Sequence, residues 1–348
     1  MTAVWDLPDF DDHEGVHLFR DRESGLTGII AIHSTKLGPA AGGTRFWHYA
    51  DRAAAITDAL RLSRGMSYKN AMAGLPMGGG KAVILANANG TKSDSLVTAF
   101  AKSVESLGGR YVTAQDVGMS ADDILAISRI TPHVCGLPAA ADQAGGDPGP
   151  STALGVFLGV KAAIKRTLGR DSAKGVHVAV QGLGSVGGGL ARLLAAEGAR
   201  LTLADRNSGR AAAIAGELGA HAVSADKIMG VAADILAPCA LGAILNESSI
   251  AALKVAAVAG GANNQLAVPE DGDRITARGI LYAPDYVINA GGIINVGVEY
   301  LKLGDRSAVE ARVAGIPARL AQIWDESAAS GDNPAKVADR IAQGLIGR

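Results

Sequence analysis

Two lysines flank an apolar, glycine-rich stretch in the segment SYKNAMAGLPMGGGK, which covers residues 67–81 and contains Lys69 and Lys81. Burial among apolar residues and a neighbouring positive charge both lower the pKa of a lysine. One of the two could therefore act as a general base near neutral pH, while the other stays protonated and binds a carboxylate. The glycines at 78–80 carry no side chains, so we expect a substrate to approach the backbone beside Lys81.

Two other interpretations of this segment compete with the first. A phosphate-binding loop would need a glycine five residues before Gly80 and a serine or threonine after the lysine, whereas the chain has Leu75 and Ala82 there. An exposed hairpin is the usual environment of lysine, but the residues between these two lysines are mostly apolar. The pattern therefore favours a buried site over an exposed hairpin and over a P-loop-like nucleotide hydrolase.

An aspartate follows a short expected strand. Residues 110–113 are predicted to form that strand, which would deliver Asp116 into a turn that contains Gly118. An acid at a strand end can reach a cleft and exchange protons there. A solvated aspartate in a surface loop is the more common case, so the residues alone leave both interpretations open.

A glycine motif typical of dinucleotide binding occupies residues 182–187. The segment GLGSVG has the G-x-G-x-x-G spacing, in which the first glycine allows a tight turn, the second lets a pyrophosphate approach the backbone, and the third lets helix and strand pack closely. The N-terminus of the helix that follows would attract the phosphates. We therefore expect the cofactor to be bound by Gly182, Leu183, Gly184, Ser185, Val186 and Gly187.

An acidic residue, Asp205, stands where the next expected strand ends. Its carboxylate could accept hydrogen bonds from the hydroxyls of the adenosine ribose, and it would repel the 2′-phosphate of NADP. NAD is therefore favoured as the cofactor, although the neighbouring Arg206 could pair with a phosphate. A glycine-rich turn that binds no cofactor is the alternative, and it fits this strand–turn–helix context less well.

The elements that must position these residues fall into two parts. In the first part the patterns predict strands at 28–33 and 81–85 and helices at 51–64, 93–107 and 121–129, the last with Ser120 as its N-cap. A Gly/Pro-rich segment at 136–150 is the expected hinge between domains, and a helix is expected at 151–168.

The second part alternates helices with short apolar runs, which is typical of a parallel sheet covered by helices on both faces. The expected strands are at 176–181, 201–205, 234–237, 255–259 and 286–289. After Asn289 the chain is predicted to be mostly helical, with a kink or break at Pro317 because proline lacks the backbone N–H.

Length and composition agree with two cores. The chain has 348 residues, of which 48% are apolar, and its net charge of -1 shows no basic surplus that would indicate nucleic-acid binding. The two cysteines, Cys135 and Cys239, are expected to be free thiols, and they form no metal motif. The acidic N-terminus is unlike a signal peptide, and no stretch of about 20 apolar residues predicts a membrane span.

Several segments together resemble the Glu/Leu/Phe/Val dehydrogenase family, most closely its leucine and phenylalanine branch. They follow the family's order along nearly the whole chain: LGPAAGGTR (37–45), SYKNAMAGLPMGGGKAVI (67–84), TAQDVGM (113–119), VAVQGLGSVG (178–187), APCALGAILN (237–246), GGANNQL (260–266), YAPDYVINAGGIINV (282–296) and NPAKVADRIAQGLI (333–346). Such a collinear set is far more specific than any single motif.

The resemblance implies an α/β fold with two domains and a cleft between them. Residues 1–140 would form a substrate-binding and oligomerisation domain, and residues 141–325 a Rossmann-type doubly wound NAD-binding domain. The remaining residues, 326–348, would form a C-terminal helix that packs back on the first domain.

The resemblance also implies catalytic roles. Lys69 would bind the substrate carboxylate, Lys81 would activate water on an imino intermediate, and Asp116 would exchange protons with the amino group. The implied reaction is the reversible, NAD-dependent oxidative deamination of an apolar L-amino acid (Leu, Val, Ile or Phe) to the 2-oxo acid, ammonium and NADH. A catalytically inactive NAD-binding regulatory protein of the same fold remains an alternative.

Further residues are expected to contact substrate or cofactor. Thr152 and Asn263 would lie on the cofactor side and Asn264 on the substrate side, although either asparagine could make the substrate contact. The proposed substrate-binding residues also include Gly43 and three that would line the side-chain pocket, Ala41, Ile293 and Val296.

These pocket positions give conflicting signals on the preferred amino acid. A small residue at 41 widens the pocket, whereas Ile293 and Val296 keep an aliphatic wall. No basic residue stands at these positions to pair a glutamate side chain.

We further expect a cytoplasmic homo-oligomer that binds neither nucleic acid nor membranes and contains no metal.

Overall fold

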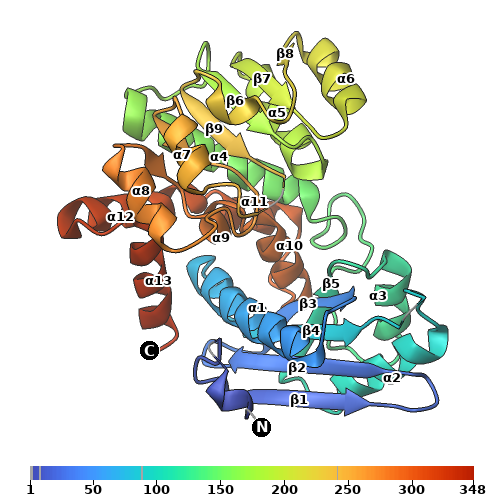
Figure 1. The fold of residues 1–348 in the computed structure, drawn as a ribbon. Coiled ribbons are helices and arrows are strands. Elements are labelled where there is room, and N and C mark those ends of the chain that lie inside the picture. The colour runs from blue at the N-terminus through green and yellow to red at the C-terminus, as the bar shows by residue number, and fades with distance from the viewer. Residues whose placement is uncertain (1–2, 8, 88, 241) are drawn as a thin grey trace. The chain divides into compact units, whose positions relative to one another are not determined.

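The computed structural model describes residues 3–7, 9–87, 89–240 and 242–348, and the chain divides into two compact units (Figure 1). The first unit consists of Met1–Asp147, Asn295–Ala308 and Ala342–Arg348, and the second of Pro148–Ile294 and Val309–Ile341. These units differ from the expected ranges 1–140, 141–325 and 326–348, because the chain returns to the first unit twice. Of the expected C-terminal helix, residues 342–348 belong to the first unit.

The Gly/Pro-rich segment at 136–150 is tied to the first unit over much of its length. The backbone N–H groups of Gly136 and Leu137 donate to the Glu299 carboxylate at 2.8 and 3.0 Å. The amide of Asn295 accepts from the N–H of Gly145 at 3.1 Å and donates to its carbonyl at 2.8 Å. These contacts explain why the border between the units lies after Asp147, later than the sequence predicted.

The first unit is built on a mixed sheet with the strand order β1-β2-β4-β3-β5. β2 is antiparallel to β1 and β4, whereas β3 is parallel to β4 and β5. The strands expected at 28–33, 81–85 and 110–113 are confirmed, and β1 and β3 had not been predicted. The strands are β1 (Gly15–Arg20), β2 (Thr27–Ser34), β3 (Ala40–Trp47), β4 (Gly78–Leu85) and β5 (Tyr111–Gln115).

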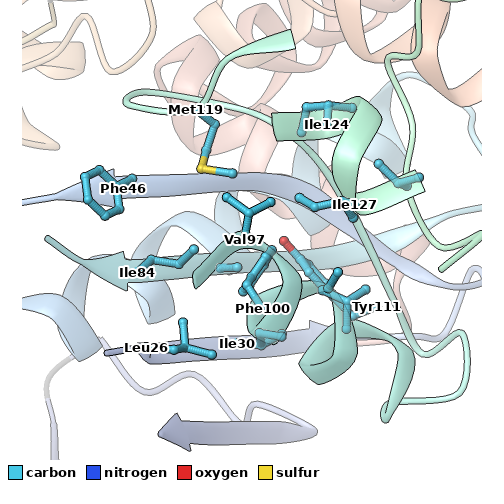
Figure 2. Close-up of a cluster of buried hydrophobic side chains, with 14 of the residues drawn as sticks. Leu26, Ile30, Phe46, Ile84, Val97, Phe100, Tyr111, Met119, Ile124 and Ile127 are labelled. Carbon is cyan, nitrogen blue, oxygen red and sulfur yellow. The ribbon is translucent and has the colours of Figure 1, made fainter. Parts of the chain in front are cut away.

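The two faces of this sheet pack against different helices, since successive side chains of a strand point to opposite sides. On β2, Ile29 is buried in a cluster with Leu60 of helix α1 (Arg52–Met72). The next residue, Ile30, is buried on the other face with Phe100 of α2 (Asp94–Glu105) and Ile127 of α3 (Ala121–Ser128), as Figure 2 shows. The expected cap of α3 is present, because the Ser120 hydroxyl accepts from the backbone N–H of Asp123 at 3.2 Å.

Helix α1 extends further than the sequence predicted. The periodic apolar pattern indicated a helix at 51–64, whereas α1 begins after its N-cap Asp51 and continues to Met72. It ends where Gly74 adopts a positive φ of 65°, a conformation that glycine accepts without strain. Lys69 therefore lies in the last turn of a helix and not in a loop.

The second unit contains a parallel sheet with the strand order β11-β10-β9-β6-β7-β8. The expected strands at 176–181, 201–205, 234–237 and 255–259 are confirmed, and the doubly wound arrangement places a switch point between β6 and β9. The strands are β6 (His177–Gln181), β7 (Arg200–Ala204), β8 (His221–Ala222), β9 (Ile235–Pro238), β10 (Ala257–Val258) and β11 (Leu281–Tyr282).

The strand predicted at 286–289 is wrong, because this stretch belongs to helix α9 (Asp285–Ile288). A run of four apolar residues cannot distinguish strand from helix by its period. The edge of the sheet is instead formed by β11, which pairs with β10 in parallel register. Pro284 stands at the N-cap of α9 and separates the two elements.

The remaining chain is mostly helical, as expected. Pro317 stands in the first turn of α12, where a missing N–H costs no intrahelical bond, and the break lies just before it. No described helix is long and apolar enough to cross a membrane. The further helices are α4 (Gly149–Leu168), α5 (Ser185–Ala196), α6 (Ser208–Leu218), α7 (Glu247–Ala252), α8 (Glu270–Ala277), α10 (Gly291–Tyr300), α11 (Arg306–Val313), α12 (Ile316–Ser330) and α13 (Pro334–Leu345), with short 3-10 turns at Val4–Asp6 and Ile228–Gly230.

Candidate active site

A buried ion pair joins Lys81 of β4 to Asp116, which follows the end of β5. Lys81 Nζ donates to Asp116 Oδ2. Lys81 is only 6% exposed, and the Asp116 side chain is 24% exposed. Asp116 is therefore not a solvated loop residue, and the two groups that the sequence singled out for proton transfer lie in direct contact.

Gly43 of β3 lies between these two residues. Its neighbour on β5 is Ala114, and the pairs Ala41–Gly79 and Thr44–Ala82 place it opposite Lys81 on β4. A Cβ atom on Gly43 would lie 2.9 Å from Asp116 Cβ and 2.8 Å from the carbonyl oxygen of Gln115. The missing side chain thus lets Lys81 reach across β3 to Asp116.

The surroundings shift the pKa of both partners. Burial lowers the pKa of Lys81, and the like charge of Arg45 acts in the same direction, although Asp116 opposes both. Burial by itself would raise the pKa of Asp116, but the charge and hydrogen bond of Lys81, with Arg45, outweigh it and keep this pKa below its usual value. Asp116 is therefore a carboxylate near neutral pH, and Lys81 loses its proton more readily than an exposed lysine.

The three glycines before Lys81 serve packing, not substrate access. A Cβ atom would lie 1.9 Å from the Ser34 carbonyl oxygen at Gly78, 2.0 Å from the Ser67 backbone nitrogen at Gly79 and 2.7 Å from the Tyr111 ring at Gly80. The space that the sequence suggested for substrate beside these glycines is filled by α1, β2 and β5 themselves. The expectation of an open approach at 78–80 is therefore wrong.

Two competing interpretations of the lysine segment are also wrong. The glycines and Lys81 lie inside β4 and not in a loop that precedes a helix, so they cannot cradle a phosphate as a P-loop does. An exposed hairpin is contradicted by the burial of Lys81.

Lys69 lies in the last turn of α1, which packs directly on β4. The next residue, Asn70, is fully buried, and its side-chain N–H donates to the carbonyl of Gly78 at 2.6 Å. This bond ties the helix turn that carries Lys69 to the start of the strand that carries Lys81. The Lys69 side chain itself is partly exposed.

In the second unit, each glycine of the motif at 182–187 has the structural role that its spacing predicted. Gly182 has a positive φ of 86° in the turn after β6. A Cβ atom on Gly187 would lie 1.8 Å from the Gly182 carbonyl oxygen, so helix and turn pack in close contact. Gly184 faces open space, and as the N-cap of α5 it leaves that helix end without a side-chain cap. A pyrophosphate fits this uncapped helix end.

Asp205 is positioned by backbone N–H groups of two turns, one after β6 and one after β7. Its Oδ2 accepts from the N–H of Leu183 at 2.7 Å, and its Oδ1 accepts from the N–H of Asn207 at 2.8 Å. Burial would raise the pKa of Asp205, but these bonds and the charge of Arg210 lower it. The carboxylate therefore stays charged, and Oδ1 keeps a second lone pair for a ribose hydroxyl.

The other residues expected near the cofactor differ in their availability. The Thr152 hydroxyl, in the first turn of α4, donates to the carbonyl of Pro148 at 2.8 Å. Asn263 Oδ1 accepts from Asn289 Nδ2 at 2.7 Å. Asn264 is exposed and has a positive φ of 51°, a conformation that asparagine adopts more often than most residues other than glycine.

Comparisons with known proteins agree with this geometry. A family model described as the dimerisation domain of Glu/Leu/Phe/Val dehydrogenase matches residues 13–133, and one described as glutamate/leucine/phenylalanine/valine dehydrogenase matches residues 204–330. Leucine dehydrogenase of Bacillus subtilis is 45% identical over 337 residues, covering 97% of this chain and 92% of that protein. The chain belongs to the Glu/Leu/Phe/Val dehydrogenase family.

Two further relatives cover nearly the same length. Valine dehydrogenase of Streptomyces albus is 43% identical over 334 residues, which are 95% of this chain and 91% of that protein. The crystal structure of L-tryptophan dehydrogenase from Nostoc punctiforme has a TM-score of 0.86 and 42% identity, and covers 96% of either chain. The expected family and two-domain α/β fold are confirmed, and the chain is an amino-acid dehydrogenase that depends on a pyridine nucleotide.

The expected pocket residues of this dehydrogenase lie on two elements. Ala41 of β3 is fully buried, and its strand neighbours are Gly79 and Val112. Ile293 and Val296 are three residues apart on α10, so they share one side of that helix. Ile293 is partly exposed, whereas Val296 is 7% exposed. Pocket lining by these residues stays a prediction.

Three polar residues had not been predicted from the sequence: Arg45, Asp58 and Asn289. Arg45 shares its strand face with Gly43 and binds Asp58 of α1. The Asn289 amide donates to Asn263, and its buried Oδ1 has no hydrogen-bond partner among the described residues. The spacing of two between Gly43 and Arg45 could have revealed the first of these. Among the described residues, no group of three or more His, Cys, Asp or Glu side chains could hold a metal ion.

Proposed function

We propose that the protein catalyses the NAD-dependent oxidative deamination of an apolar L-amino acid to its 2-oxo acid, ammonium and NADH. The observation that carries the proposal is the buried contact between Lys81 Nζ and Asp116 Oδ2 in a chain of this dehydrogenase family. A buried amine with a lowered pKa and an adjoining carboxylate form a pair suited to moving protons on a substrate nitrogen and oxygen.

NAD is the proposed nucleotide because of Asp205. Its carboxylate is held by two backbone N–H groups and remains ionised. Hydroxyls of the adenosine ribose could donate to it, whereas the 2′-phosphate of NADP would meet a like charge. Two basic residues follow Asp205, Arg206 and Arg210. Arg210 Nη1 lies 3.5 Å from Asp205 Oδ2, so the charge of Arg210 is already paired with this carboxylate.

Three side chains divide the work of the proposed reaction. A bound nicotinamide would supply the hydride acceptor for the substrate Cα. Neutral Lys81 takes a proton from water as that water attacks the substrate carbon, and the resulting ammonium stabilises charge that develops on the oxygen. Asp116 exchanges protons with the amino nitrogen that leaves as ammonia. Lys69 stays protonated and binds the α-carboxylate, which orients the Cα for these steps.

An apolar substrate side chain is proposed from the expected pocket. Ala41, Ile293 and Val296 offer no charge to a glutamate side chain. The relatives are named for leucine, valine and tryptophan, whose side chains share only their apolar character. Asn264 is proposed to contact the substrate rather than Asn263, because the Asn263 amide oxygen already accepts from Asn289.

A deamination screen tests this proposal. The full chain is incubated with L-Leu, L-Val, L-Phe, L-Trp and L-Glu, each with NAD and with NADP, and reduced nucleotide is followed by its absorbance. We expect turnover with apolar amino acids and NAD. A preference for L-Glu would contradict the proposed pocket, and a preference for NADP would contradict the role of Asp205 and point to Arg206.

A homo-oligomer is proposed as the working form. The match of residues 13–133 to a model described as a dimerisation domain supports it. Light scattering on the purified protein measures the mass in solution, and a mass of 35.2 kDa would correspond to a single chain and contradict the proposal.

A further inference from the structure

A third charged side chain lies beside the Lys81–Asp116 pair. Arg45 Nε is 3.5 Å from Asp116 Oδ2, the same oxygen that accepts the hydrogen bond of Lys81. This Nε is buried and has no hydrogen-bond partner among the described residues. The nitrogen therefore faces Asp116 without being committed to another acceptor.

Asp58 of α1 holds the other end of the Arg45 guanidinium. Asp58 Oδ2 accepts from Arg45 Nη1 at 2.8 Å and from the Tyr49 hydroxyl at 2.6 Å. Its Oδ1 accepts from Arg61 Nη2 at 3.3 Å. The Asp58 side chain is 11% exposed, so solvent screens these interactions less than it would at the surface. The guanidinium is thus clamped between one carboxylate on the helix and another at the end of β5.

This arrangement affects both members of the proposed catalytic pair. Arginine stays protonated at every pH at which proteins fold, so Arg45 contributes a permanent positive charge. That charge favours the ionised form of Asp116 and disfavours the protonated form of Lys81. Without it, Lys81 would be the main cation bound to Asp116, and the ion pair would hold the lysine in its protonated form.

We propose that Arg45, clamped by Asp58, is a positioning residue that keeps Asp116 oriented and ionised and leaves Lys81 free to lose its proton. The inference rests on the proposed function, in which Lys81 is the base and Asp116 exchanges protons. Arg45 acts through these two residues and need not touch the substrate. Its guanidinium also gives Asp116 a fixed partner at the moment when Lys81 turns to the substrate.

Other charged and titratable groups on the surrounding elements could influence the same pair. On α1 and in the loop after β3, the groups that contact Arg45 or its partner Asp58 are Asp58, Arg61 and Tyr49. Lys69 is a further basic residue, in the last turn of α1. Arg61 offers a matched control, because it binds the same carboxylate as Arg45 but is 56% exposed. Replacing Arg61 removes one positive charge next to the Asp58 carboxylate and leaves the Arg45–Asp116 contact in place.

The experiment compares Arg45→Gln, Arg45→Lys and the control Arg61→Gln in the full-length protein. The carboxyl carbon of Asp116 is titrated by NMR with labelled aspartate, and its signal is assigned by its loss in Asp116→Asn. In Arg45→Gln we expect the pKa of Asp116 to rise by about one unit or more. In Arg45→Lys the pKa of Asp116 should lie between the values of wild type and Arg45→Gln, because lysine carries the charge but lacks the rigid planar guanidinium. Arg61→Gln should show the wild-type titration.

The pH profile of kcat/KM with L-leucine is the second measurement. Loss of Arg45 raises the pKa of Lys81, so the acid limb of the profile should move to higher pH, and Arg45→Lys should move it part of the way back. A wild-type titration of Asp116 in Arg45→Gln would overturn the inference. If the wild-type enzyme turned over no amino acid, the proposed function would fail, whereas the titration would still decide whether Arg45 sets the ionisation of Asp116.

A fold control accompanies both measurements. Each variant is melted and compared with wild type by circular dichroism. Should Arg45→Gln fail to fold, Arg45→Met takes its place, because it also removes the charge and keeps an unbranched side chain. We expect it to raise the pKa of Asp116 in the same direction, and an unchanged or lowered value would overturn the inference.

Discussion

A side chain on Gly43 would collide with Asp116, because their Cβ atoms would be 2.9 Å apart. Gly43 was expected to contact substrate, and the structure gives it a further role: it clears the path across β3 by which Lys81 reaches Asp116. The proposed proton-transfer pair therefore depends on a residue that carries no functional group.

Gly43→Ala should displace Asp116 and lower kcat more than it changes KM for the amino acid. A misplacement of about 1 Å in a catalytic group can cost roughly 100-fold in rate. Steady-state kinetics measure the effect. The matched control is Gly65→Ala on α1, where a Cβ would meet nothing within 4 Å, and this change should leave kcat unaltered and stabilise the helix by about 0.5–1 kcal/mol. Equal kinetics for the two variants would rule out the role of Gly43.

Lys81→Ala should nearly abolish turnover while NADH binding persists. General acid–base groups contribute about 100- to 10,000-fold to rate, and the nucleotide is expected at the turn of residues 182–187 in the other unit. Turnover and fluorescence titration with NADH are measured on the same preparation. A variant that retained near wild-type kcat would refute the assignment of Lys81 as the base.

Lys69→Ala should act mainly on substrate affinity. The expected loss is one charge-assisted hydrogen bond to the α-carboxylate, which contributes about 1.5–3 kcal/mol. KM is measured for both the amino acid and the 2-oxo acid, because both carry this carboxylate. Unchanged KM values for the two substrates would contradict the carboxylate contact.

The pocket substitutions should shift preference without creating an absolute specificity. Ala41→Leu should move the ratio of kcat/KM away from phenylalanine and towards leucine or valine, and Ile293→Ala should move it the other way. One methylene in an apolar pocket changes discrimination by about 1–3 kcal/mol. Ala41 is fully buried, so the melting temperature of Ala41→Leu is measured alongside. If the Leu/Phe ratio stays constant in both folded variants, the pocket lies elsewhere.

The first unit should lose stability as the pH falls from 6.5 towards 4. Burial lowers the pKa of His33 from 6.5 to about 4, and the charges of Arg348 and His13 act in the same direction. His33 is therefore neutral in the folded chain at neutral pH. Its contribution to stability is complete above pH 6.5 and is lost between pH 6.5 and about 4, where the unfolded chain binds the proton and the folded chain does not. The maximum loss is about 3 kcal/mol.

Urea unfolding between pH 7 and pH 4 measures this dependence. In Arg348→Gln the pKa of His33 should rise, since Arg348 Nη1 lies 2.8 Å from His33 Nε2, and the pH-dependent loss should become smaller. A dependence identical to wild type in this variant would show that the arginine charge does not reach His33.

The local patterns of the sequence were sufficient for much of the fold. Each glycine at 182–187 and the acid at 205 occupy the positions that their spacing predicted, because a turn between strand and helix is a short-range structure. The lysine and aspartate motifs were also identified, since their residue types suit proton transfer. The run at 286–289 was misassigned because four apolar residues show no distinguishing period.

The tertiary structure alone decided which of these residues meet. Lys81 and Asp116 are joined only because β3, between β4 and β5, carries a glycine at the crossing point. The glycines at 78–80 turned out to make room for α1, β2 and β5, and Asp58 of α1 became the anchor of Arg45. Sequence spacing reports which side chains share one element, whereas strand order and helix packing determine contacts between elements, and those depend on the whole chain.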